Sequence, residues 1–330
     1  MTEPKFRLKQ AREFVFQKFG DNWAKATFLP LALREKLNEE CPLEIKADVL
    51  VSNKEDSVKA RVTLRDGLQI ETVLMGHKDG RNTVCVSSQV GCPLGCLFCA
   101  TGKMGFKRSL SVEEILEQVT FFERYLEPKN ERVTNVTFMG MGEPFLNYDN
   151  VLKAIRILNI KEFFNISIRS ISVSTAGIIE GIEKFANEGL QANLAISLHA
   201  PNDELRKNLM PIDKNYPLEK VLMAVDEYIK KTNRKVMFEY LLIKDVNDSE
   251  KQAEELAKLM RNPSPSLRAR KLYFLNLILY NATGSFKPST TAQVEKFKVV
   301  LTKNKINFVQ RYRFGDDIQA ACGQFATNIK

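Results

Sequence analysis

The chain lacks any hydrophobic run long enough to cross a membrane. No stretch of its 330 residues approaches the roughly 20 apolar residues that a membrane-spanning helix needs. The N-terminal segment MTEPKFRLKQAREF has no apolar core of the kind found in secretory signal peptides, and the chain has no internal repeat or low-complexity segment. We therefore expect a cytoplasmic protein without a membrane partner.

Cysteine is also scarce, and its placement is uneven. Four of the six cysteines fall in residues 84–102, VCVSSQVGCPLGCLFCATG. In a cytoplasmic chain such cysteines are more often metal-binding or catalytic than part of a disulfide framework. A fifth, Cys41, belongs to no pattern and is expected to be a packing residue.

Three cysteines of this stretch, Cys92, Cys96 and Cys99, form the pattern C-x3-C-x2-C. Soft thiolate ligands select iron–sulfur clusters, zinc or copper(I). A structural zinc site normally has four protein ligands, whereas three thiolates leave one iron of a four-iron cluster open to a substrate or cofactor. We expect such a cluster. A zinc loop completed by Cys85 or a distant histidine, and simple packing, are the alternatives.

Basic residues are concentrated near the C-terminus of a chain whose formal charge is +9. Residues 286–313 contain seven lysines and arginines against one acid, and residues 261–271 add Arg261, Arg268, Arg270 and Lys271. Such a surface is either a solvated face or a contact for nucleic-acid phosphates. Charge alone does not decide between them.

Hydrophobic periodicity divides the chain into three parts. Residues 1–42 show two helical patterns, at 6–19 and 30–40, and residues 43–80 show three alternating strands. Within residues 81–330 strands alternate with helices, which predicts a parallel sheet with right-handed crossovers. About six such units predict an α/β fold with a partial barrel. The segment NPSPS at 262–266 is the one plausible linker.

The motifs whose residues could take part in catalysis or cofactor binding follow the expected strands, and barrel active sites lie at these strand ends. They are the cysteine loop, Gly140-Met141-Gly142-Glu143-Pro144, Ser174, a strand end at His199, and Asn281. The glycine-rich loop is not G-x-G-x-x-G, so a dinucleotide-binding fold is not expected. Glycines around Cys322 predict a terminal loop over 314–330 that could cover the barrel mouth.

The pattern C-x3-C-x-aromatic-C resembles that of radical S-adenosylmethionine enzymes. Together with FRLKQ, GMGEPFLN, SVSTAG, AISLHAPND, LMPI and GDDIQAACGQ, it makes nearly the whole chain similar to the RlmN/Cfr family of radical methyltransferases. The resemblance implies a partial (β/α)6 barrel, a 4Fe–4S cluster and S-adenosylmethionine. It also implies an adenine base in 23S rRNA as substrate.

The family's roles carry over residue by residue. The resemblance implies cluster ligation by Cys92, Cys96 and Cys99, a methylated cysteine at Cys322, a resolving cysteine at Cys85 and a proton acceptor at Glu71. The implied contacts to S-adenosylmethionine are Gly142, Glu143, Ser174, Ser197, Leu198, His199 and Asn281. The Asn281 region, LILYNATGSFKPS, departs from the family's proline-rich version.

The implied reaction begins with methylation of Cys322, continues through a covalent adduct between this cysteine and RNA, and ends with a Cys85–Cys322 disulfide. RlmN-type members methylate adenine C2, including an adenosine of tRNA, and Cfr-type members methylate C8. Pro144 favours the RlmN type. A monomer with flavodoxin or ferredoxin as electron donor is expected. A non-catalytic RNA-binding protein with a zinc loop is the alternative from another class.

Overall fold

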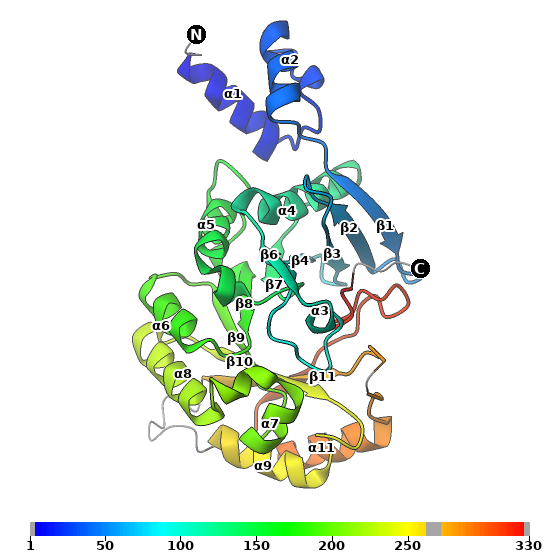
Figure 1. Ribbon diagram of the computed structural model, residues 1–330, viewed down its shortest axis with the longest axis vertical. Coiled ribbons are helices and arrows are strands. Elements are labelled where there is room, and N and C mark those ends of the chain that lie inside the picture. The colour runs from blue at the N-terminus through cyan, green and yellow to red at the C-terminus, as the bar shows by residue number, and fades with distance from the viewer. Residues whose placement is uncertain (1–3, 262–271, 285, 327–330) are drawn as a thin grey trace.

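The computed structural model describes residues 4–261, 272–284 and 286–326. The expected linker at 262–266 and the basic residues Arg268, Arg270 and Lys271 lie outside these ranges. Figure 1 shows two N-terminal helices at one end of the molecule, beyond a large sheet that carries helices on its outer side. In the described ranges no helix is both long and apolar enough to cross a membrane.

The two N-terminal helices are α1 (Lys5–Phe16) and α2 (Leu31–Glu40), joined through a short 3-10 helix (Trp23–Lys25). They have a core of their own, formed by Phe14, Trp23, Ala26 and Leu29. The guanidinium of Arg124 donates to the carbonyls of Phe19, Gly20 and Leu43 at 2.6–2.8 Å and so attaches this module to the rest. Cys41 is exposed, so its prediction as a packing residue is wrong.

The three expected strands of the β extension are β1 (Lys46–Val51), β2 (Ser57–Thr63) and β3 (Gln69–Gly76). They pair in an antiparallel manner, with a tight turn in which Gly67 has a positive φ. β3 then pairs antiparallel with β4 (Asn82–Cys85). The extension therefore belongs to the same sheet as the core.

From β4 onward the sheet is parallel and its strands follow chain order. The later strands are β7 (Asn135–Phe138), β8 (Ile171–Thr175), β9 (Asn193–Ser197), β10 (Val236–Leu242), β11 (Tyr273–Leu279) and β12 (Phe308–Gln310). Between them lie α4 (Val112–Leu126), α5 (Tyr148–Asn159), α6 (Ile179–Asn187), α8 (Leu218–Thr232), α9 (Glu250–Arg261) and α11 (Thr291–Lys303). The predicted α/β fold with a partial barrel is confirmed.

Local signals explain where several helices begin. A capping box formed by Ser111 and Glu114 opens α4, and a second one formed by Thr290 and Gln293 opens α11. Pro217 is the N-cap of α8 rather than its first helical residue. The periodicity did not predict β5 (Gln89–Gly91), β6 (Phe106–Ser109), the short helix α3 (Ala100–Lys103) or α7 (Asp203–Leu209).

Candidate active site

A cavity of about 620 Å³ lies inside the curved sheet, lined by residues of β3, β4 and each later parallel strand. Eleven of the thirteen predicted site residues line it: Cys85, Cys92, Cys96, Cys99, Gly142, Glu143, Ser174, Ser197, His199, Asn281 and Cys322. These residues come from positions spread over more than 200 residues of chain. The fold therefore brings together most of what the sequence motifs single out.

The three-cysteine loop is held at its base by the β5–β6 hairpin. The backbone N–H of Cys92 donates to the carbonyl of Gly105 at 2.9 Å. Gly91 has a φ of +74°, and a Cβ at this position would lie 1.8 Å from the same Gly105 carbonyl oxygen. Only glycine fits so close a backbone approach. The loop ends are therefore fixed while its three thiols face one cavity.

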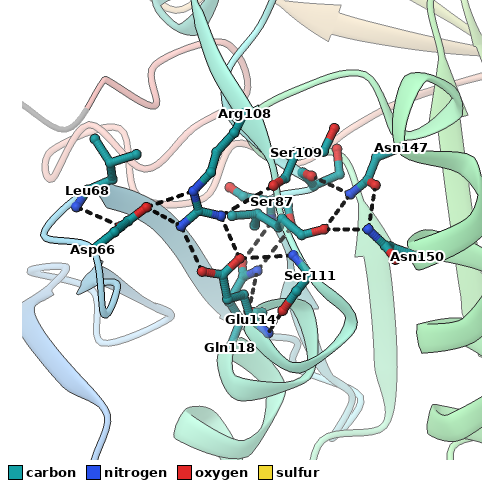
Figure 2. Close-up of polar contacts among 12 residues, drawn as sticks. Asp66, Leu68, Ser87, Arg108, Ser109, Ser111, Glu114, Gln118, Asn147 and Asn150 are labelled. Atoms are coloured by element: carbon teal, nitrogen blue, oxygen red, sulfur yellow. Dashed lines mark hydrogen bonds and ion pairs between the residues drawn. The ribbon is translucent and has the colours of Figure 1, made fainter.

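The same hairpin is braced from outside by a polar network, shown in Figure 2. Arg108 donates to both carboxylate oxygens of Glu114 at 2.8 Å and to Asp66 at 2.7 Å. The amide of Asn147 donates to the carbonyls of Ser88 and Leu110, both at 2.8 Å. These bonds connect the hairpin that encloses the cysteine loop to α4, to the β extension and to the segment just after the glycine-rich loop.

The thiols of the loop fit a cationic iron centre. Burial, together with smaller effects of Glu143 and Cys99, raises the pKa of Cys92 to about 12, and burial and the neighbouring cysteines raise the pKa of Cys96 well above its usual value. Cys92 is buried and Cys96 and Cys99 are partly buried, and three thiolates on one short loop would repel one another unless a cation lay between them. Such a loop binds metal by exchanging thiol protons for the cation.

Glu143 is a buried carboxylate on the glycine-rich loop. Its oxygens accept from the backbone N–H of Ala176 at 2.7 Å and of Phe145 at 3.1 Å. Burial raises its pKa to about 7, although these hydrogen bonds oppose the shift. Gly142, with a φ of +98°, passes so close to Gln89 that a Cβ would lie 2.5 Å from that side chain. The loop thus places a preoriented acid beside the cysteine loop, suited to an ammonium ligand.

The ends of β8 and β9 supply neutral polar groups. Ser174 and Ser197 line the cavity, as does His199 just after β9. The Leu241 backbone N–H donates to Nδ1 of His199 at 3.1 Å, which leaves Nε2 as the protonated nitrogen. Burial lowers the pKa of His199 to about 3, assisted by the charge of Arg206. The imidazole is therefore a neutral donor at physiological pH.

Leu198 departs from the prediction. Its side chain is completely buried in the main core, and it does not line the cavity. The reason is the alternation of side chains along a strand, which directs Ser197 to the cavity and its neighbour to the opposite face. The structure leaves only the Leu198 backbone for a contact to a bound cofactor.

The C-terminal loop closes over the cysteine loop through backbone contacts. Ala100 N–H donates to the Gly323 carbonyl at 2.8 Å, and the hydroxyl of Thr101 donates to the Phe325 carbonyl at 2.7 Å. The amide of Asn281 donates to the Cys322 carbonyl at 3.1 Å. Asn281 thus orients this loop, and Cys322 reaches the cavity while remaining exposed to solvent.

Cys85 lies at the end of β4 in the same cavity and is buried. Burial, with a smaller contribution from the neighbouring Cys322, raises the pKa of its thiol to about 12, although Thr137 and Arg311 oppose the shift. All six cysteines of the chain are free thiols in this structure. The implied disulfide between Cys85 and Cys322 is therefore not present here.

Glu71 lies outside the cavity. Its carboxylate forms an ion pair with Lys59 at 2.8 Å, and both side chains are buried. The other oxygen accepts from the backbone N–H of Ala326 at 2.9 Å. The expected proton acceptor is thus engaged by a cation and covered by the C-terminal segment. The structure does not bring it to the reacting sulfurs.

Charged groups that the motifs did not reveal also line the cavity, among them Glu239 and Arg311. Glu239 on β10 is buried and accepts from Asn276 at 2.9 Å, and Arg311 lies 3.8 Å from its other oxygen. An acid within the apolar strand VMFEYLL was a usable signal for Glu239. Arg311 was counted with the basic residues of 286–313, but it faces the barrel interior rather than forming part of an open basic surface.

Comparison with known proteins gives one consistent result. The model of the radical SAM superfamily matches residues 86–257. The chain is 44% identical to the "Probable dual-specificity RNA methyltransferase RlmN" of Dictyoglomus thermophilum over 98% of this chain and 90% of that protein. It is 42% identical to the protein of the same name from Streptococcus suis, over 99% and 88% of the two chains.

The crystal structure of a radical SAM methyltransferase from Sphaerobacter thermophilus has the same fold throughout. It is 39% identical, with a TM-score of 0.93 over 98% of this chain and 94% of that one. The superfamily's cofactors, a 4Fe–4S cluster and S-adenosylmethionine, are those that the residues of the cavity fit. The chain belongs to the radical SAM superfamily and, within it, to the family of the RlmN methyltransferases.

Proposed function

We propose that this protein methylates C2 of an adenosine in 23S rRNA, and an adenosine of tRNA, through a methylcysteine and a covalent RNA adduct. The relatives named as dual-specificity RNA methyltransferases support the RNA substrate. The observation that carries the proposal is that Cys85 and Cys322 line one cavity with Cys92, Cys96 and Cys99. A zinc loop that only binds RNA has no use for two further thiols there.

Adenine C2 is an electron-poor carbon without a nucleophilic lone pair, so polar methyl transfer to it is not feasible. When bound, the cluster and S-adenosylmethionine supply a 5′-deoxyadenosyl radical, which can take a hydrogen atom from a methyl group. Glu143 is the proposed partner of the cofactor's ammonium group. Ser174, Ser197, His199, Asn281, Gly142 and the Leu198 backbone are its proposed further contacts.

Cys322 is the proposed methyl carrier. Its exposure lets it accept a methyl group, and its place in the cavity lets the resulting methylene carbon attack C2 of an adenine that has left its stack. The addition leaves an unpaired electron on the adduct, and one electron would return to the bound cluster as the C2 proton is removed. The Cys85 thiolate then attacks the sulfur of Cys322. The carbon–sulfur bond breaks, a disulfide forms, and the released carbon takes up a proton to become the product methyl. A reductant then resets the two thiols.

Glu71 remains the proposed acceptor of the C2 proton, and the role requires movement. A general base must come within hydrogen-bond reach of the proton that it removes. Because Ala326 and Lys59 occupy the Glu71 carboxylate, the segment around Phe325 and Ala326 must be displaced when RNA binds.

Nucleoside mass spectrometry tests the proposal. RNA from cells lacking the gene is incubated with reduced enzyme, digested and analysed, and 2-methyladenosine is expected. Appearance of 8-methyladenosine instead would assign Cfr-type chemistry, and absence of both products with a correctly assembled cluster would refute the proposal. We further propose a cytoplasmic monomer reduced by flavodoxin or ferredoxin. Its accessory modules are residues 1–42 and 43–80, and its core is 81–330.

A further inference from the structure

Three aromatic rings form a ladder at the edge of the cavity. The ring centroids of Tyr312 and Phe314 lie 4.7 Å apart at an interplanar angle of 72°, and those of Phe314 and His77 lie 4.9 Å apart at 70°. All three residues line the cavity. Tyr312 is 57% exposed, whereas Phe314 and His77 are half-buried. The ladder therefore runs from solvent into the cavity.

The inner end of this aromatic ladder connects to a proposed reacting group. Nε2 of His77 lies 3.0 Å from Oγ1 of Thr83. Thr83 and Cys85 lie two residues apart on β4, and both line the cavity. Side chains two positions apart on a strand share a face, so the ladder leads along one strand to Cys85.

The charges beside the ladder are close to balanced. Arg81 pairs with Asp79 at 2.9 Å, Arg313 lies 3.7 Å from Asp316, and the Tyr312 hydroxyl donates to Asp56 at 3.2 Å. Burial and the nearby charge of Arg81 lower the pKa of His77, so its ring is neutral at physiological pH. Lys54, 6.0 Å from the Tyr312 ring centroid, and Arg311, which lies 3.8 Å from Glu239, are further cations beside it. What this edge offers a ligand is aromatic surface rather than strong positive charge.

We propose that Tyr312, Phe314 and His77 stack the unpaired RNA bases that flank the target adenosine. The inference rests on the proposed function for the identity of the substrate as RNA. An adenosine that enters the cavity leaves its neighbours without a stacking partner. Aromatic side chains replace such stacking for any base, because every base presents a π-face. The ladder would thus hold the flanking bases while the adenine reaches the thiols.

The test measures binding of the holoenzyme to an RNA stem–loop with one unpaired adenosine, by fluorescence anisotropy. Loss of a base–aromatic stack predicts that Tyr312→Ala weakens binding by about 5- to 150-fold. The matched control Tyr312→Phe keeps the ring and loses only the hydrogen bond to Asp56, so its affinity should stay within about threefold. Because the lost contact is not ionic, the slope of log affinity against log salt should not change in either variant.

A second arm identifies what the ring contacts. An abasic nucleotide next to the adenosine should weaken wild-type binding as Tyr312→Ala does, and the two changes together should cost no more than either alone. Equal RNA affinity of Tyr312→Ala and wild type would overturn the stacking role of the ladder, and this holds even if Tyr312→Ala lowers the thermal stability of the protein. Fully additive losses of affinity would overturn it as well. The methylated position is read separately by mass spectrometry. If RNA binding depends on the ladder but no 2-methyladenosine is formed, the proposed function is refuted and the stacking role of the ladder is retained.

Discussion

Release of the RNA adduct should depend steeply on pH, because the proposed resolving thiol is buried. The pKa of Cys85 is raised to about 12, and only a thiolate attacks a sulfur centre efficiently. Because this pKa lies well above neutral pH, the thiolate fraction rises about tenfold per pH unit between pH 7 and pH 9. The release rate should therefore increase about tenfold between pH 7 and pH 8, and again to pH 9.

A pH-jump experiment isolates this step. Adduct is accumulated in a single turnover at pH 6.5, and the sample is moved to a series of higher pH values. Release is followed as loss of the protein–RNA band on denaturing gels. Cluster reduction and attack on adenine are complete before the jump, so they do not affect the measured rate. Adenosine deuterated at C2 shows whether proton removal limits release instead.

The control is Cys85→Ala, which should form the adduct and retain it at every pH, whereas Cys322→Ala should form none. A release rate that stays constant from pH 7 to pH 9, without a deuterium effect, would refute the assignment of a buried thiol as the attacking group. Release of the adduct by Cys85→Ala would refute the role of Cys85 itself.

Three further predictions concern the cofactor, a buried ion pair and the proposed RNA surface. Cys96→Ala should abolish cluster assembly, because iron loses a thiolate; iron and sulfide analysis after anaerobic reconstitution measures this. Arg206→Met should lower the free energy of unfolding, measured by urea titration, by about 3–5 kcal/mol, because it leaves the buried carboxylate of Asp213 unpaired. The double variant Arg206→Met with Asp213→Asn removes both charges and should lower it by only about 1–3 kcal/mol. Charge reversal at Lys9 and Arg12, on the exposed side of α1, should flatten the salt dependence of RNA affinity without changing the cluster spectrum, and an unchanged slope would exclude α1 from the interface.

Most elements of the fold could be predicted from local pattern. Alternation of strand and helix periods after residue 80 identified each parallel strand, and Ser111 followed by Glu114 has the local pattern of a capping box at the start of α4. These signals are local, since they depend on which side chains face the core and on the capping of free N–H groups. The β5–β6 hairpin was missed because it is short and encloses an irregular loop.

Side-chain roles were less predictable than elements. Leu198 was placed at the cofactor by motif, yet strand alternation directs it to the core. Glu71 was expected at the reacting carbon, yet Lys59 from the neighbouring strand neutralises it. Arg311 was counted with a basic surface, yet it lies beside Glu239 inside the barrel. Each outcome depends on a partner that is distant in sequence or on a direction that spacing does not specify.

The sequence by itself determined the parallel α/β architecture and the three-thiol loop, because periodicity and ligand spacing are properties of short segments. The tertiary structure alone decided that Cys85 and Cys322, more than 200 residues apart, share one cavity with that loop. It also decided that His77 and Tyr312 both pack against Phe314 at the cavity edge. The physical reason is that strand pairing and loop closure are long-range contacts, so the groups that they bring together leave no periodic or local trace in the chain.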